Sequence, residues 1–269
     1  MTMLTLDHPV FPRERPFQET VAGRRIIGML EKARPEWLSL CSKVARYQDR
    51  YRAIAHRSIA TEPATPHWIN DMLPGLDAMF LYTLIADWRP RTYIEVGSGN
   101  STKFVRRAIT DHLTSTRIVS IDPCPRAEVD AICDEMIRAP LEEVDDLTRF
   151  SGLMPGDIIF IDNSHRSFQN SDVTVFFTEI MPMLPPGVLY GIHDIFLPFD
   201  YPDAWADRYY NEQYLLTTYL LGGASGDRIV FPGAYVSRDA EAQRVLKWIH
   251  TDPWYAELEK HANGFWLKR

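Results

Sequence analysis

The sequence predicts an α/β protein in which a doubly wound, mostly parallel sheet of seven strands follows an N-terminal helical cap. From Arg91 onward, short apolar runs alternate with helical stretches, the pattern of consecutive strand–helix–strand units on a parallel sheet. Before Arg91, helical periodicity is interrupted by prolines. We therefore expect a helical extension over residues 1–90 and a sheet-containing domain over residues 91–269.

The helical extension shows no pattern that indicates chemistry of its own. Apolar residues recur at helical spacing over residues 36–54, and a second helix is expected over residues 75–88. Between them, residues 61–66 contain two prolines, which remove backbone donors and disfavour helix. This stretch is expected to be a linker.

Seven apolar runs account for the expected strands. Ligands of open α/β sheets lie beyond the carboxyl ends of the strands, so polar residues that follow the strong runs are candidate site residues. The expected strands are the strong runs 93–96, 118–121, 157–161 and 188–192, a weaker run at 136–138, a strand at 228–231, and an edge strand at 265–267. Helical sequence is expected at 208–221 and 239–261.

Composition disfavours several classes of protein. A net charge of −7 disfavours a nucleic-acid partner, because such proteins carry a clustered basic face. No apolar stretch approaches the roughly 18 residues of a membrane span, and the first residues lack the pattern of a secretory signal. The three cysteines form no CxxC pair, which fits a reducing cytoplasm. We expect a soluble, cytoplasmic protein, with homo-oligomer formation left open.

The most informative segment is residues 93–102, a strand that enters a glycine-containing turn and then a helix. Gly97 and Gly99 would let the backbone approach a ligand closely, and the helix start offers free N–H groups. The dinucleotide fingerprint GxGxxG is not met, because Thr102 stands at its third glycine. A nicotinamide-dependent oxidoreductase is therefore disfavoured, and we keep this function only as an alternative.

Asp122 follows the next predicted strand, about two dozen residues beyond the glycines, as in nucleoside-binding sites. A carboxylate at this place can accept hydrogen bonds from both hydroxyls of a ribose. The competing interpretation is that Asp122 only caps the next turn.

The acid-x-Gly-x-Gly-x-Ser motif that begins at Glu95 resembles the first motif of class I S-adenosylmethionine-dependent methyltransferases, which have a Rossmann-like fold. Asp162 and His165 after one strand, with His193 and Asp194 after another, resemble the strand ends of methyltransferase family 24, mostly small-molecule O-methyltransferases. The resemblance spans residues 91–221. The residues expected to bind the S-adenosylmethionine cofactor are Glu95, Gly97, Ser98, Gly99, Asn100, Ser101, Asp122 and Asp162.

Two chemistries are open to the acids and histidines at these strand ends. A neutral histidine can take the proton of a hydroxyl during methyl transfer. Alternatively, Asp162, His193 and Asp194 could bind a divalent ion such as magnesium. Related enzymes, including catechol O-methyltransferase, carry an acid where this chain has His193, and a nitrogen ligand suits magnesium less well than oxygen. We therefore expect metal to be dispensable and name His193, His165 and Asp194 as catalytic.

The expected function is O-methylation of a small hydroxylated acceptor: a sugar, a glycan precursor or a natural product. Residues 208–214 combine tyrosines with hydrogen-bonding groups and are expected to line the acceptor pocket, although packing of a helix face against the sheet would also explain the tyrosines. His165 could instead cap a turn, and His193 could be a core residue. A non-catalytic, cofactor-binding subunit also stays open as a function for the chain.

Overall fold

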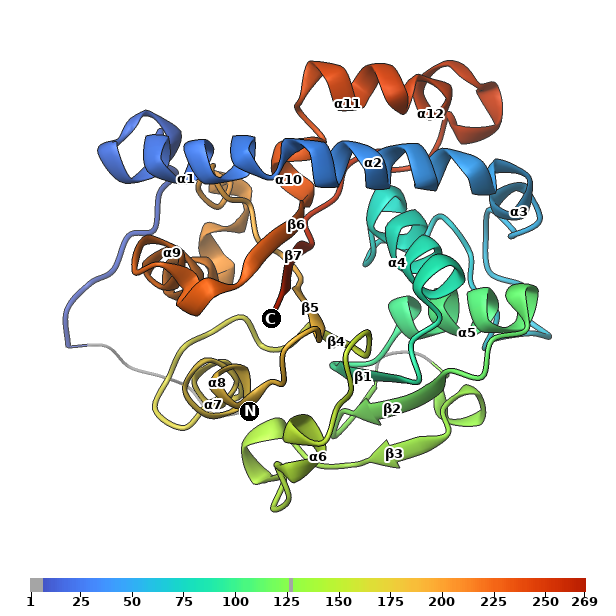
Figure 1. Ribbon diagram of the computed structural model, residues 1–269, viewed down its shortest axis with the longest axis horizontal. Helices are drawn as coiled ribbons and strands as arrows, with labels where there is room; N and C mark the ends of the chain where they lie inside the picture. The colour runs from blue at the N-terminus through green and yellow to red at the C-terminus, as the bar shows by residue number, and fades with distance from the viewer. Residues whose placement is uncertain (1–6, 126–127) are drawn as a thin grey trace.

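The computed structural model describes residues 7–125 and 128–269. Over these residues the chain forms one seven-stranded sheet in the order β3-β2-β1-β4-β5-β7-β6, with only β7 antiparallel to its neighbours (Figure 1). The expected doubly wound, mostly parallel sheet is confirmed. The strands are β1 (Thr92–Val96), β2 (Arg117–Ile121), β3 (Glu135–Ile137), β4 (Ile158–Ile161), β5 (Leu189–Ile192), β6 (Arg228–Pro232) and β7 (Phe265–Lys268).

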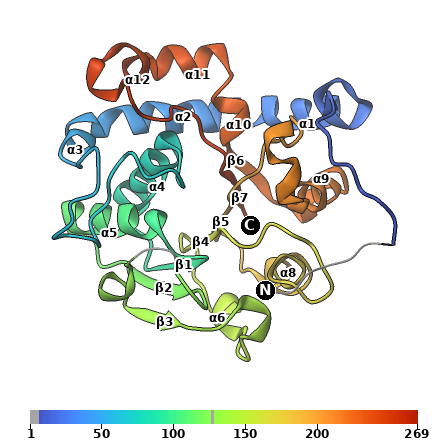
Figure 2. The same ribbon diagram turned by 180° about the vertical axis from the view of Figure 1, so that it is seen from behind.

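Helices cover both faces of the sheet, because successive strand residues point to opposite sides. Tyr93 packs into the core beneath α4 and α5, whereas Ile94 packs into the core on the other face. Figures 1 and 2 show α4 and α5 on one side of the sheet and α8 and α9 on the other. The central strands are therefore buried on both faces, which explains why they read as unbroken apolar runs.

The register of the parallel strands brings three chain segments to one edge of the sheet. Val96 at the end of β1 pairs with Ile161 at the end of β4, and Ile161 pairs with Ile192 at the end of β5. The residues that follow these strands, Gly97, Asp162 and His193, therefore emerge side by side. This edge is where the candidate site lies.

The expectation that residues 265–267 form an edge strand is wrong. β7 pairs with β5 on one side and with β6 on the other, and β6 is the edge. Trp266 packs so closely over β5 that a Cβ on Gly191 would lie 2.5 Å from its ring. A short apolar run at the end of a sequence does not reveal on how many sides the strand is paired.

The N-terminal helices are present, but their boundaries differ from the expected ones. The helix expected over residues 36–54 is divided into two helices by a 3-10 turn at residues 45–47, and the preceding helix α1 was not anticipated. Figure 1 shows α1 and α2 running end to end, with α2 between the sheet and α11. These helices are α1 (Val21–Lys32), α2 (Arg34–Val44), α3 (Gln48–Arg52) and α4 (Gly75–Trp88).

Helix α4 differs from the others in being buried along nearly its whole length, and it packs against α5 in the core beside the sheet. The division of the chain at residue 90 stays a prediction.

The remaining helices are short. The helix expected from residue 208 begins only at Glu212, because Tyr209 adopts a left-handed conformation that ends the preceding 3-10 turn. The helical sequence expected over residues 239–261 forms two helices and one 3-10 turn, which ends at Tyr255. These helices are α5 (Asn100–His112), α6 (Thr148–Ser151), α7 (Asp172–Val175), α8 (Met181–Met183), α9 (Glu212–Leu221), α10 (Gly233–Val236), α11 (Ala240–Val245) and α12 (Lys247–Thr251).

Among the described residues, no helix has the length and apolar character needed to cross a bilayer. The three cysteines are all free.

Candidate functional site

The turn after β1 depends on two glycines for different reasons. Gly97 has a φ of +81°, and a Cβ there would lie 1.8 Å from the backbone oxygen of Asp162. It is therefore required by the fold itself, where the ends of β1 and β4 meet. Gly99 has extended backbone, and a Cβ there would meet nothing within 4 Å. Only at Gly99 does the turn leave open space that a ligand could approach.

Glu95 is fully buried, and its carboxylate is bound to the first turn of α5. One oxygen accepts a hydrogen bond from the hydroxyl of Ser101, and the other accepts one from Thr102 at 2.6 Å. Burial raises the pKa of Glu95 to about 8, although these hydrogen bonds act in the opposite direction. Glu95 thus holds the start of α5 against β1, and its contact with the methionyl end of a cofactor stays a prediction.

Asp122 is half-buried and joins the ends of β1 and β2. Its carboxylate accepts hydrogen bonds from the backbone N–H groups of Ser98 and Cys124, both at 2.8 Å. It therefore does cap the turn that follows β2, and it also lies beside the glycine turn, where a nucleoside would have to bind. Its role as ribose ligand stays a prediction.

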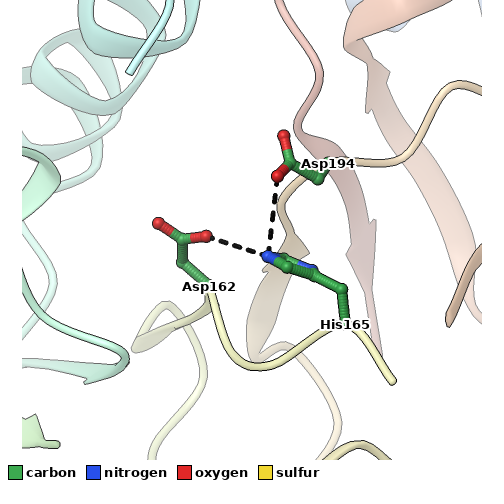
Figure 3. A group of neighbouring side chains, drawn as sticks. All are labelled: Asp162, His165 and Asp194. Carbon is green, nitrogen blue, oxygen red and sulfur yellow. Dashed lines mark ion pairs between the residues drawn. The ribbon is translucent and has the colours of Figure 1, made fainter. Parts of the chain in front are cut away.

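Two aspartates and two histidines meet beyond β4 and β5. The Nε2 atom of His165 lies 3.3 Å from Oδ1 of Asp162 and 3.6 Å from Oδ2 of Asp194 (Figure 3). The Nδ1 atom of His193 lies 3.4 Å from Oδ1 of Asp162 and 3.4 Å from Oδ1 of Asp194. All four residues predicted to share chemistry are therefore in contact, and we refer to them as the His–Asp cluster.

Each histidine of the cluster is supported from behind by a buried acid that sequence reasoning did not single out. Glu212 on α9 lies 3.0 Å from Nδ1 of His165, and Asp77 on α4 lies 3.3 Å from Nε2 of His193. Asp77 also accepts hydrogen bonds from the backbone N–H groups of Asn263 and Gly264. The sequence offered one signal for Asp77, since it is an acid within the apolar run that forms α4.

The acids determine the protonation of the histidines. Burial alone would lower the pKa of His165, but its hydrogen bonds to Asp162 and Glu212 outweigh burial and raise the pKa well above its usual value. The pKa of His193 is raised in the same way, by the charges of Asp194 and Asp162 against the effect of burial. Burial raises the pKa of Asp194 and of Glu212. The cluster therefore holds protons between imidazole and carboxylate groups.

Two members of the cluster have left-handed backbone conformations that side-chain-bearing residues rarely adopt. His165 has a φ of +58° and Asp194 a φ of +54°. Such conformations cost free energy and concentrate at functional sites. Asn163 helps to hold the first of these turns, since its side chain accepts a hydrogen bond from the N–H of His165 and donates one to Glu212.

The donor set fits a divalent cation. Asp162, His165 and Asp194 each present a ligand atom, and these atoms lie within 4.8 Å of one another (Figure 3). Metal-binding histidines usually donate their second N–H to a carboxylate, which is the arrangement that Glu212 gives to His165. The structure thus groups His165, and not the expected His193, with Asp162 and Asp194. Nitrogen donors suit transition-metal ions better than magnesium.

Comparisons with known proteins bear on the same segment. A family model described as a methyltransferase domain matches residues 94–195. None of the curated proteins matches the chain in sequence.

Similar solved structures include the MycE methyltransferase from the mycinamycin biosynthetic pathway, in complex with Mg, SAH and mycinamycin VI. It is 24% identical over 41% of this chain and 31% of that chain, with a TM-score of 0.31, so this chain spans less than a third of its length. The methyltransferase PaMTH1 of Podospora anserina, bound to SAH, is 15% identical over 70% of this chain and 80% of that chain, with a TM-score of 0.40.

An O-methyltransferase from Bacillus cereus in complex with SAH is 14% identical over 85% of this chain and 89% of that chain, with a TM-score of 0.35. The matched residues 94–195 begin in β1, include the glycine turn and extend through the His–Asp cluster. Over residues 94–195 the chain therefore matches a methyltransferase domain, and these residues belong to a seven-stranded, mostly parallel sheet.

Proposed function

We propose that the protein transfers the methyl group of S-adenosylmethionine to a hydroxyl oxygen of a small molecule. The observation that carries this proposal is the position of the His–Asp cluster directly beside the glycine turn. Gly97 packs against the backbone of Asp162, so a cofactor held beyond β1 would present its reactive end to the cluster. Proton-accepting groups at that place serve a hydroxyl acceptor.

The reaction is an in-line displacement. The acceptor oxygen bonds to the methyl carbon, the carbon–sulfur bond breaks, and its electron pair returns to sulfur, which leaves S-adenosylhomocysteine. The proton of the hydroxyl passes to an imidazole nitrogen of the cluster in its unprotonated form, and then to solvent. Because the neighbouring acids raise the pKa of both histidines, this form is favoured at high pH. Alignment of oxygen, carbon and sulfur supplies most of the acceleration, and a general base contributes about 10²–10⁴-fold.

The surroundings favour His165 over His193 as the base. The His165 ring lies 4.6 Å from the ring of Tyr210, on the side where aromatic residues of the 200–214 segment gather. The His193 ring instead lies between Phe160 and Asp77, within the core beside the sheet. We assign proton transfer to His165. His193 and Asp194 would position Asp162 and the acceptor.

A second route is supported by the convergence of ligand atoms at Asp162, His165 and Asp194. A divalent cation at these residues would orient the acceptor hydroxyl and lower its pKa. Glu212 would then fix the imidazole of His165 as a ligand instead of as a base. The two routes make opposite predictions for chelation.

The test begins with calorimetric titration of the protein with S-adenosylmethionine, followed by transfer of labelled methyl groups to a panel of phenols, sugars and hydroxylated natural products. For an accepted compound, His165→Ala should lower the single-turnover rate by about 10²–10⁴-fold with cofactor affinity retained. The matched control is His250→Ala, at an exposed position on α12. Loss of activity in EDTA with recovery on adding a divalent ion would establish the metal route, and tighter binding of NAD than of S-adenosylmethionine would overturn the proposed function.

A further inference from the structure

A cavity of about 820 Å³ lies next to the His–Asp cluster, between segments that are far apart in the sequence. Its walls come from Val10 and residues 12–15, from Arg166 and Phe168, and from the 200–214 segment. This volume is near the upper end of the range for small-molecule sites, about 300–1,000 Å³. It is larger than a single sugar or catechol ring requires.

The cavity is joined to His165 by direct contacts. Tyr210, which lines it, has its ring 4.6 Å from the His165 ring. Its neighbour Asn211 donates its backbone N–H to the backbone oxygen of His165 at 3.0 Å and accepts a hydrogen bond from the N–H of Ser167. His165 itself is buried and does not line the cavity, so Tyr210 and Asn211 are the link between the cavity wall and the proposed base.

The wall on this side is built from aromatic rings. Tyr210 lies 5.7 Å from Trp205 and 6.0 Å from Tyr201, both nearly perpendicular to it. Trp205 and Tyr210 are only partly buried, and the guanidinium of Arg208 covers one face of the Trp205 ring at 3.8 Å from its centroid. Exposed aromatic faces bind flat rings and ring-shaped apolar surfaces.

Three basic and three acidic side chains line the cavity, and they are not all paired with one another. Asp200 pairs with Arg15 and accepts a hydrogen bond from the hydroxyl of Tyr214, and Asp203 accepts one from the N–H of Glu14. By contrast, Arg166 has no carboxylate partner within the part of the chain that the structure describes.

Arg166 donates to the backbone oxygens of Ser164 and Arg208, and its guanidinium lies 5.1 Å from the Tyr210 ring. Arg13 and Glu14, which also line the cavity, add one charge of each sign. A cation without a counter-charge therefore stands beside the aromatic wall.

We propose that this cavity is the acceptor site and that it selects a flat, ring-containing hydroxyl compound with an anionic group. The rings would lie against Tyr210 and Trp205, the anionic group on Arg166, and the hydroxyl toward His165. This assignment rests on the proposed methyl transfer for its chemistry. The binding preference itself can be measured without cofactor.

The test uses two fluorescent probes that differ in one group. 8-Anilinonaphthalene-1-sulfonate carries an anionic sulfonate, and N-phenyl-1-naphthylamine is its neutral counterpart. Each is titrated against the wild-type protein, Arg166→Gln, Arg166→Lys, Trp205→Leu, and the control Arg244→Gln, which changes an exposed arginine on α11. Melting temperatures of all variants report whether the fold is retained.

Arg166→Gln should weaken binding of the sulfonate by about two- to fivefold, the factor that an ion pair at a solvent-accessible site contributes, and leave the neutral probe unchanged. Arg166→Lys should keep the sulfonate affinity close to wild type. Trp205→Leu should weaken both probes, and Arg244→Gln neither.

Equal losses for both probes in Arg166→Gln would overturn the anionic preference, and wild-type binding of both by Trp205→Leu would overturn the site itself. Since no cofactor is present in these titrations, either result is separate from the calorimetric test of S-adenosylmethionine binding.

Discussion

The buried carboxylate of Glu95 makes the stability of the protein depend on pH in a way that one substitution should remove. Burial raises its pKa from 4.5 to about 8 in the folded protein. Between these two values the folded state holds a proton that the unfolded chain releases. The stabilisation is therefore complete below about pH 4.5 and is lost as the pH rises through about 8.

The size of this effect follows from the difference between the two pKa values. At about 1.4 kcal/mol for each unit, 3.5 units amount to at most about 5 kcal/mol between pH 4.5 and pH 8. Glu95→Gln keeps the shape and cannot ionise. Its amide can still accept one hydroxyl hydrogen bond and donate to the other hydroxyl, so the contacts with Ser101 and Thr102 can be retained.

Urea unfolding of both proteins at several pH values from 5 to 8.5 measures the difference directly. The free energy of unfolding of Glu95→Gln should rise relative to wild type as the pH increases, because only the wild type acquires a buried charge. Glu179→Gln, at an exposed position, should run parallel to wild type. Parallel curves for Glu95→Gln as well would refute the reasoning, since they would show that Glu95 ionises alike in both states.

Three further predictions concern the cofactor and the base. Gly99→Ala should leave the melting temperature unchanged but weaken S-adenosylmethionine binding in calorimetry. Gly97→Ala should instead lower the melting temperature, because its Cβ would meet the Asp162 backbone. Asp122→Ala should weaken cofactor binding by roughly 1–3 kcal/mol, the usual cost of unpaired polar groups, and unchanged affinity would remove the ribose assignment. Glu212→Gln should lower kcat and shift the pH profile of turnover to lower pH, with KM nearly unchanged. The reason is that the substitution removes the negative charge that stabilises the protonated form of His165. A pH profile identical to that of the wild type would contradict this role of Glu212.

The sequence predicted those site residues whose place in the fold depends on the local pattern of strands and turns. In a parallel sheet, each strong apolar run ends at the same edge, so Asp162, His165, His193 and Asp194 could be expected to meet there before any contact was known. Their contacts follow from strand register, which the apolar runs already imply. The glycine turn after β1 was identified for the same reason.

Residues that reach the site from helices could not be predicted in this way. Asp77 lies on α4 and Glu212 on α9, and both depend on how a helix is placed over the sheet, which local pattern does not determine. The order of β6 and β7, and the approach of residues 10–15 to the cavity, are likewise set by tertiary packing. Each involves contacts between segments that are distant in sequence.

Asp77 and His193 depend on each other, and this explains why a histidine can stand at position 193. An acid there would place a second buried carboxylate beside Asp77, and like charges in a buried site strongly disfavour ionisation of both. The protonated imidazole instead pairs with Asp77 on one side and with Asp162 and Asp194 on the other.

A double-mutant cycle measures this dependence. Asp77→Ala and His193→Ala should each destabilise the protein, and the double variant should lose less than the sum of the two, by a coupling free energy of about 0.5–3 kcal/mol. The loss of backbone hydrogen bonds to Asn263 and Gly264 cancels in the cycle, because it occurs with and without His193. Additive losses would mean that the two residues act independently, and that Asp77 serves only to hold the chain before β7.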